Sequence, residues 1–100
     1  MNFWNETDPL KPRGVKDPDA VLDYPINFNG WLTDASAVYK LHTVTVTGGL
    51  VVDSTYEVSG IIVVILSGGT LGETASFTIR IETMDGRIDD RTFYLDIVQR

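Results

Sequence analysis

The stretch SFTIRIETMDGRIDDRTFYLDIV, Ser76–Val98, decides the fold class, because two alternating segments flank a short turn. The apolar positions of both segments are odd-numbered: Phe77, Ile79, Ile81, Phe93, Leu95 and Ile97. Alternation with a period of two is typical of half-buried β-strands. The stretch therefore predicts two antiparallel strands that share one buried face.

Side-chain parity selects the length of the turn between these strands. A two-residue loop at Asp85 and Gly86 would pair odd with even residues and send the two apolar sets to opposite faces. A three-residue loop that starts at Met84 puts both sets on one face, and it needs a left-handed residue at its end, where Gly86 lies. This register predicts four opposed pairs, which are Phe77 with Phe93, Ala75 with Leu95, Thr78 with Thr92, and Arg80 with Asp90.

Similar short runs rich in β-branched and aromatic residues occupy the chain upstream, with turn residues between them. The expected strands are Ile26–Leu32, Val38–Val46, Leu50–Val58, Ile61–Leu66, Thr74–Thr83 and Ile88–Val98, with a further short one near Val21–Tyr24. Regularly spaced short strands are typical of sandwiches and barrels. We therefore expect an all-β, immunoglobulin-like antiparallel β-sandwich of about seven strands over residues 20–100.

The first quarter of the chain differs from the rest in its prolines. All four prolines lie there, at Pro9, Pro12, Pro18 and Pro25. Proline removes a backbone donor and pushes the preceding residue into the extended region. Residues 1–19 are therefore predicted to be an extended, proline-rich N-terminal arm.

Composition restricts the classes of partner. The chain has 100 residues and a net charge of −6, which suits one domain and disfavours a phosphate backbone as a ligand. It has no cysteine, so disulfides and thiolate sites are excluded. The start of the chain lacks a secretory-signal pattern, and its longest apolar run is far shorter than a bilayer span. We expect neither a nucleic-acid nor a membrane partner.

The segment Ile61–Leu66 is apolar at every position. Such a run is typical of a strand that is covered on both faces. One face is expected to meet the core of the domain. The other face meets another protein or is covered by the N-terminal arm, and the sequence leaves both possibilities open.

The glycine-rich stretch LSGGTLGET, Leu66–Thr74, has the composition of a ligand-binding turn. It has neither the lysine and spacing of a P-loop nor the spacing of a dinucleotide-binding turn. A strand pattern follows it, so no helix N-terminus is available for an anion. We interpret it as the crossing from one sheet to the other, and we expect no cofactor.

No catalytic or metal-binding pattern emerges. His42 is the only histidine and falls in an alternating strand, and the sequence has no G-x-S-x-G elbow. The loop aspartates lack EF-hand spacing and are interpreted as turn residues; they are Asp17, Asp19, Asp23, Asp85, Asp89 and Asp90. The chain is therefore not expected to be an enzyme.

Two groups of aromatic residues are candidates for binding. Phe3 and Trp4 lie in the proline-rich arm, where little core is available, and large apolar residues of this kind often anchor interfaces. Trp31 is expected at an edge of the sandwich. Trp31 and Tyr24 would be the candidates if the domain were a carbohydrate- or receptor-binding module.

The segments VKDPDAVLDYPINFNGWL and LSGGTLGETASFTIRIETMDGRIDDRTF resemble a family of small tailed-bacteriophage structural proteins, the fiber-tail adaptor type. The resemblance covers about Lys16 to Val98 and is weaker in the middle of the chain. The motif at Lys16, Asp17, Pro18 and Asp19 belongs to it, and together with Phe3 and Trp4 these residues are the candidate partner-binding set.

The resemblance implies a non-enzymatic virion protein, made in the host cytoplasm and assembled into the phage tail, its connector or a fiber attachment point. Its partners would be other virion structural proteins, with a homo-oligomeric ring as the expected assembly. The alternatives are a capsid decoration protein, a tail tube or terminator protein, or the carbohydrate-binding module.

Overall fold

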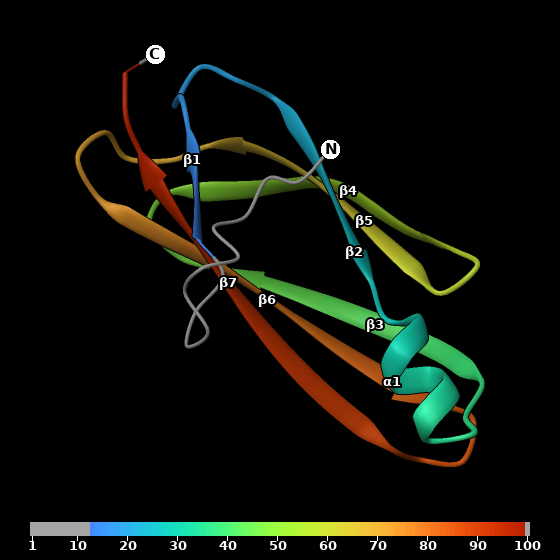
Figure 1. Cartoon of the computed structure of the whole chain (residues 1–100). Coiled ribbons are helices and arrows are strands. Elements are labelled where there is room, and N and C mark those ends of the chain that lie inside the picture. Colours follow the sequence, from blue (N-terminus) through green and yellow to red (C-terminus); the bar gives the residue numbers. More distant parts are fainter. Residues whose placement is uncertain (1–12, 100) are drawn as a thin grey trace.

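The computed structural model describes residues 13–99, which form two β-sheets and one short helix (Figure 1). The elements are β1 Arg13–Lys16, β2 Leu22–Asn27, α1 Asn29–Asp34, β3 Tyr39–Val46, β4 Leu50–Val58, β5 Ile61–Gly68, β6 Thr74–Thr83 and β7 Ile88–Ile97. One sheet has the order β1-β7-β6-β3 and the other β2-β5-β4. This confirms an all-β chain with two sheets, whereas the immunoglobulin-like assignment stays a prediction.

The β6–β7 hairpin has the register that parity predicted. Phe77 opposes Phe93, and Thr78 opposes Thr92. The two phenyl rings stack with centroids 5.2 Å apart, and the two threonine hydroxyls lie 2.9 Å apart. Gly86 has φ +89°, the left-handed conformation that the three-residue loop requires.

The core lies between the sheets and receives side chains from both. Its members are Tyr24, Ile26, Phe28, Leu32, Leu50, Ile62, Val64, Leu66, Ala75, Phe77, Ile79, Ile81, Phe93, Leu95 and Ile97. On β5, residues 62, 64 and 66 are buried while residues 61, 63 and 65 are only half-buried. The continuous apolar run of β5 therefore has one face in the core and one face outside it.

The prediction of a strand over Ile26–Leu32 was wrong in its second half. The strand β2 ends at Asn27, and Asn29–Asp34 form α1. The Asn27 side chain accepts a hydrogen bond from the Asn29 N–H at 2.8 Å, which turns the chain, and the Leu32 N–H donates to the Phe28 carbonyl at 2.9 Å. Phe28 and Leu32 are both buried, so a four-residue spacing places both in the core.

The segment Arg13–Lys16 belongs to a sheet, although the sequence predicted an arm as far as residue 19. It forms β1, which pairs with β7 in parallel, so the sandwich is not wholly antiparallel as expected. The Lys16 carbonyl accepts a hydrogen bond from the Val98 N–H at 2.9 Å, and in such a ladder alternate residues bond to the partner strand.

Candidate interaction surfaces

A buried lysine holds the corner between β1 and β2. The Lys16 side chain is fully buried, and its Nζ donates to the carbonyls of Asp17 at 2.9 Å, Ala20 at 2.6 Å and Gly68 at 2.7 Å. An ammonium group has three donors, and all three are used. Lys16 therefore joins the KDPD corner to the glycine-rich crossing 52 residues later.

Burial lowers the pKa of Lys16, while the nearby carboxylates of Asp17, Asp19 and Asp53 oppose that change. The three carbonyl dipoles stabilise the ammonium form in a site that water does not reach. The corner itself is a turn in which the Asp17 carboxylate accepts a hydrogen bond from the Asp19 N–H at 2.8 Å. Asp19 is exposed, whereas Asp17 and Pro18 are half-buried.

The glycine-rich stretch is the crossing between sheets, as the sequence predicted, since β5 and β6 belong to different sheets. Gly69 has φ +107°, and a Cβ there would lie 2.7 Å from the Ile97 Cδ1. Its N–H donates to the Gly49 carbonyl at 3.0 Å. The glycines thus allow the backbone conformation of the crossing, and the Gly68 carbonyl accepts a hydrogen bond from Lys16.

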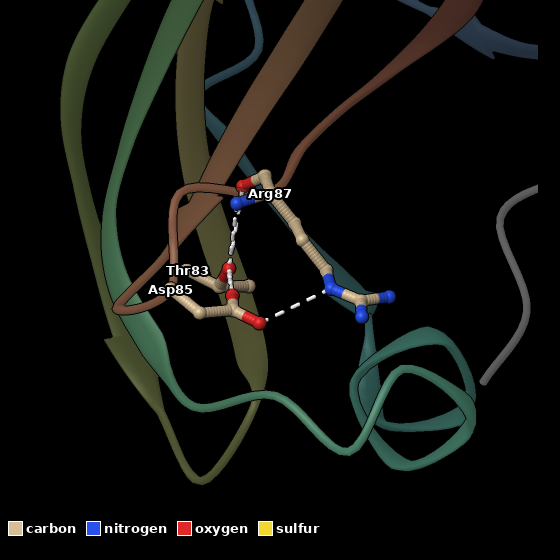
Figure 2. A network of polar contacts seen from close by, with 3 residues as sticks. All are labelled: Thr83, Asp85 and Arg87. Carbon is tan, nitrogen blue, oxygen red and sulfur yellow. Dashed lines mark hydrogen bonds and ion pairs between the residues drawn. The ribbon is translucent and has the colours of Figure 1, made fainter.

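The turn at the far end of β6 and β7 is closed by a polar network (Figure 2). The Thr83 hydroxyl donates to the Asp85 carboxylate and accepts from the Arg87 N–H at 3.0 Å. The Arg87 Nε donates to the same carboxylate at 3.1 Å. The Thr83 hydroxyl and the Arg87 guanidinium lower the pKa of Asp85, so this loop aspartate has the structural role expected of it.

A hollow of about 640 Å³ lies between α1 and the strands β3 and β4. It is lined by Asn29, Leu32, Thr33, Ser36, Ala37, Val38, Tyr39, Glu57 and Gly60. Two of these side chains, Tyr39 and Glu57, lie near His42, whose ring bridges the two sheets. Its Nδ1 lies 2.7 Å from the Tyr39 hydroxyl and its Nε2 lies 2.8 Å from the Thr55 hydroxyl.

Burial lowers the pKa of His42, and Glu57 opposes this change. A neutral imidazole donates through one nitrogen and accepts at the other, and both hydroxyls can take the complementary role. The contacts therefore tie the edge strands β3 and β4 together. Among residues 13–99, no group of three or more histidine or carboxylate side chains could hold a metal ion.

The outer face of the sheet β1-β7-β6-β3 is polar in its centre, with the exposed apolar residues Val15, Leu41 and Ile88 toward its margins. The Arg80 guanidinium donates to both Asp90 oxygens, at 2.8 and 3.0 Å, as the predicted register required. A hollow of about 310 Å³ lies beside this pair, lined also by Thr43, Thr45 and Thr78. On this face the Thr78 and Thr92 hydroxyls thus bond to each other and Arg80 bonds to Asp90.

The outer face of the sheet β2-β5-β4 is apolar in its centre. The register sets Pro25, Val63 and Tyr56 side by side, between a row of Asn27, Ile61 and Val58 and a row of Asp23, Ile65 and Ser54. We call the six apolar residues of these rows the apolar face: Pro25, Tyr56, Val58, Ile61, Val63 and Ile65. Tyr56 is 50% exposed and Val58 54%.

The candidate partner-binding and carbohydrate-binding residues do not come together in one site of the described structure. Phe3 and Trp4 lie outside the described residues. The Lys16 side chain points into the domain, and of the adjoining motif residues Asp19 is the most accessible. Tyr24 is only 1% exposed and packs on Phe77, so it cannot stack on a sugar as the carbohydrate alternative required.

Sequence reasoning missed the bridge at His42 and the hollow beside α1. His42 was interpreted only as one residue of an alternating strand, although its inward parity was readable from Val44 and Val46. Its partner Thr55 is on a strand of the other sheet. Nothing in the sequence shows that β3 and β4 face each other at this point.

Comparison with known proteins bears on the role of these surfaces. Residues 16–96 match the family model described as "Podophage GP4 fiber-tail adaptor protein gp77". The match begins at the buried lysine and ends near the close of β7. A search of curated proteins found none that matches. No helix in the described part of the chain is long and apolar enough to cross a membrane.

Proposed function

The chain belongs to the podophage fiber-tail adaptor family, since the family match covers residues 16–96, and from this premise we propose that it joins neighbouring virion proteins at the phage tail. The family is one of structural adaptors, which supports a non-enzymatic role. The observation that carries the proposal is the family match. The apolar face supports it, because a sandwich that works alone normally keeps the outer faces of its sheets polar.

The proposed contacts are the N-terminal segment with Phe3 and Trp4, the exposed part of the corner at Asp17, Pro18 and Asp19, and the apolar face. Lys16 acts by holding the corner in place, because its side chain is buried. Apolar centres with polar rims are typical of protein interfaces. The corner and the apolar face both include residues of β2 or its approach, so one partner could contact both.

We further propose that several copies form a closed ring. Each sheet of the described structure ends in edge strands, β1 and β3 in one sheet and β2 and β4 in the other. Exposed edges favour pairing with other chains unless they are protected, and a ring of heterologous contacts protects every edge in the same way. The protein would be made in the host cytoplasm and enter the particle during assembly.

Cryo-electron microscopy of the intact particle tests this function. We expect density for the sandwich at the tail, at the connector or at the base of a fiber, in a ring of about six to twelve copies. Density on the capsid surface in far larger numbers would identify a decoration protein instead. Density repeated along the tail would identify a tube protein.

A glycan array tests the carbohydrate alternative separately. Trp31 is half-buried against the core, and Tyr24 is inaccessible, so we expect no glycan to bind. Binding that Trp31→Ala abolishes, with the fold intact by circular dichroism, would revive that alternative.

A further inference from the structure

We propose that the apolar face binds the N-terminal segment of this protein, residues 1–12, with Phe3 and Trp4 as the anchoring side chains. This deepens the proposed function by naming the two surfaces that meet. It rests on that function only for the expectation that several copies come together in one particle.

The two sheets differ in the polarity of their outer faces, and this difference indicates which face binds another segment. The outer face of β1-β7-β6-β3 carries Thr43, Thr45, Thr78 and the Arg80–Asp90 pair in its centre. Its exposed apolar residues Val15, Leu41 and Ile88 lie on three different strands with polar residues between them. The apolar face of β2-β5-β4 carries six apolar side chains in three adjoining rows, with Asp23, Asn27 and Ser54 at its rim. A contiguous exposed patch of this kind marks a binding surface.

The strand β5 strengthens the argument because it is central in its sheet. Its outward residues Ile61, Val63 and Ile65 are half-buried in the middle of the sheet, between β2 and β4. A central strand with water on one face normally alternates apolar and polar residues. The apolar outward residues of β5 indicate that a second layer covers them.

The N-terminal segment has the chemistry to form that layer. Phe3 and Trp4 are adjacent aromatic residues in a stretch that also holds Pro9 and Pro12. Prolines favour an extended backbone with little entropy to lose on binding, and aromatic anchors are the commonest hot spots of interfaces. An extended segment can therefore lay both rings across the rows of the apolar face.

The segment is long enough to reach the face. The described chain begins at Arg13 in β1, an edge strand of the opposite sheet. Packed sheets are about 10 Å apart and neighbouring strands about 4.8 Å, whereas the nine Cα-to-Cα steps from Trp4 to Arg13 span up to about 30 Å. Trp4 can therefore reach β5 around the β2 edge of its own subunit, or β5 of a neighbouring subunit.

Cysteine cross-linking of the full-length chain tests the contact, because the natural sequence has no cysteine. Asn5→Cys places a thiol beside the anchors and leaves them intact. Tyr56→Cys places the second thiol on the apolar face, and Thr45→Cys places it on the polar face as the matched control. With a short bismaleimide we expect about tenfold more cross-linking for the pair with Tyr56→Cys than for the control pair, since a docked segment raises the local concentration.

The same experiment separates contacts within one subunit from contacts between subunits. Mixing the Asn5→Cys and Tyr56→Cys single variants gives a covalent dimer only if the segment docks on a neighbour, and either geometry supports the proposal. Phe3→Ser with Trp4→Ser should remove the preference for the apolar face. Equal yields on both faces, or a preference that survives loss of both anchors, would overturn the proposal.

Tryptophan fluorescence provides a readout that needs no reagent. In a Trp31→Phe variant, Trp4 is the only tryptophan. If the segment docks, its emission should be blue-shifted. Adding Val58→Lys should return the emission to the wavelength of solvent-exposed tryptophan. An emission maximum at the wavelength of solvent-exposed tryptophan in the Trp31→Phe protein without Val58→Lys would contradict docking in the isolated protein. Neither result alters where cryo-electron microscopy places the protein, so failure here leaves the adaptor function to be judged separately.

Discussion

At the scale of single residues, the most informative side chain is Lys16. Its ammonium group is fully buried and coordinates three backbone carbonyls from two parts of the chain that lie far apart in sequence. Both segments that carry the family resemblance meet at this contact. Lys16 therefore has a structural role at the corner of this chain.

Removing the Lys16 ammonium should destabilise the fold. Lys16→Met keeps the length of the side chain but leaves the carbonyls of Asp17, Ala20 and Gly68 without this donor, so we expect a loss of about 1–3 kcal/mol. Urea unfolding measures it. The control is Lys40→Met on the exposed Lys40, whose effect should stay within about 0.5 kcal/mol. Equal effects of the two substitutions would show that the corner does not depend on Lys16.

His42 should make stability depend on pH. Its folded pKa is below the ordinary value, so the unfolded state binds more protons as pH falls through about 6.5, and stability decreases there until the folded histidine is protonated as well. The lowered pKa values of Asp85 and Asp90 act in a separate range, below about pH 4.

Unfolding of wild type and His42→Gln at pH 7.5 and pH 5 measures this dependence. Between pH 7.5 and pH 5 the wild type should lose more unfolding free energy than His42→Gln. Glutamine does not titrate, so all other groups cancel in the comparison. A constant difference across the range would contradict the predicted direction of the pKa change.

At the scale of elements, α1 closes one end of the sandwich. It follows directly from β2, and its buried residue Leu32 joins the core beside Phe28. The Arg91 guanidinium from β7 lies 4.5 Å from the centre of the Phe28 ring. This short helix therefore connects the end of one sheet to a strand of the other.

Truncating the buried side chain of α1 tests its importance. Leu32→Ala should cost about 2–4 kcal/mol, because it removes core contacts and leaves a cavity. Thr33→Ala changes the neighbouring exposed position of the same helix and should cost less than about 0.5 kcal/mol. Calorimetric or urea unfolding of both variants gives the comparison. A cost for Leu32→Ala as small as that of the control would show that α1 contributes little to the core.

At the scale of the whole molecule, one outer face of the sandwich has a polar centre and the other has an apolar centre. A contiguous apolar centre on one face is typical of a binding surface, and in the proposed function this is the side that meets its partner. The family membership and the asymmetry are independent observations. Both favour a protein that contacts neighbouring proteins.

A charge on the apolar face should block assembly without unfolding the subunit. Val58 is 54% exposed in the sheet, so Val58→Lys should leave the sandwich folded, and a cost above the roughly 0.5 kcal/mol of an ordinary surface substitution would come from release of the docked N-terminal segment. We expect the variant to be absent from particles made by phage that lack the wild-type gene, with Thr45→Lys incorporated normally. Normal incorporation of Val58→Lys would exclude the apolar face from the interface.

The sequence by itself determined the all-β class, the β6–β7 register and the sheet crossing at the glycines. Each of these follows from short-range periodicity, since parity in a hairpin leaves one loop length compatible with a shared core. Tertiary structure alone decided that Asn29–Asp34 are helical, that Arg13–Lys16 join β7, that Lys16 is buried, and that Pro25, Tyr56 and Val58 extend the outer apolar side of β5 into a three-strand face. Those features depend on contacts between segments far apart in the chain, and local propensity yields to such packing.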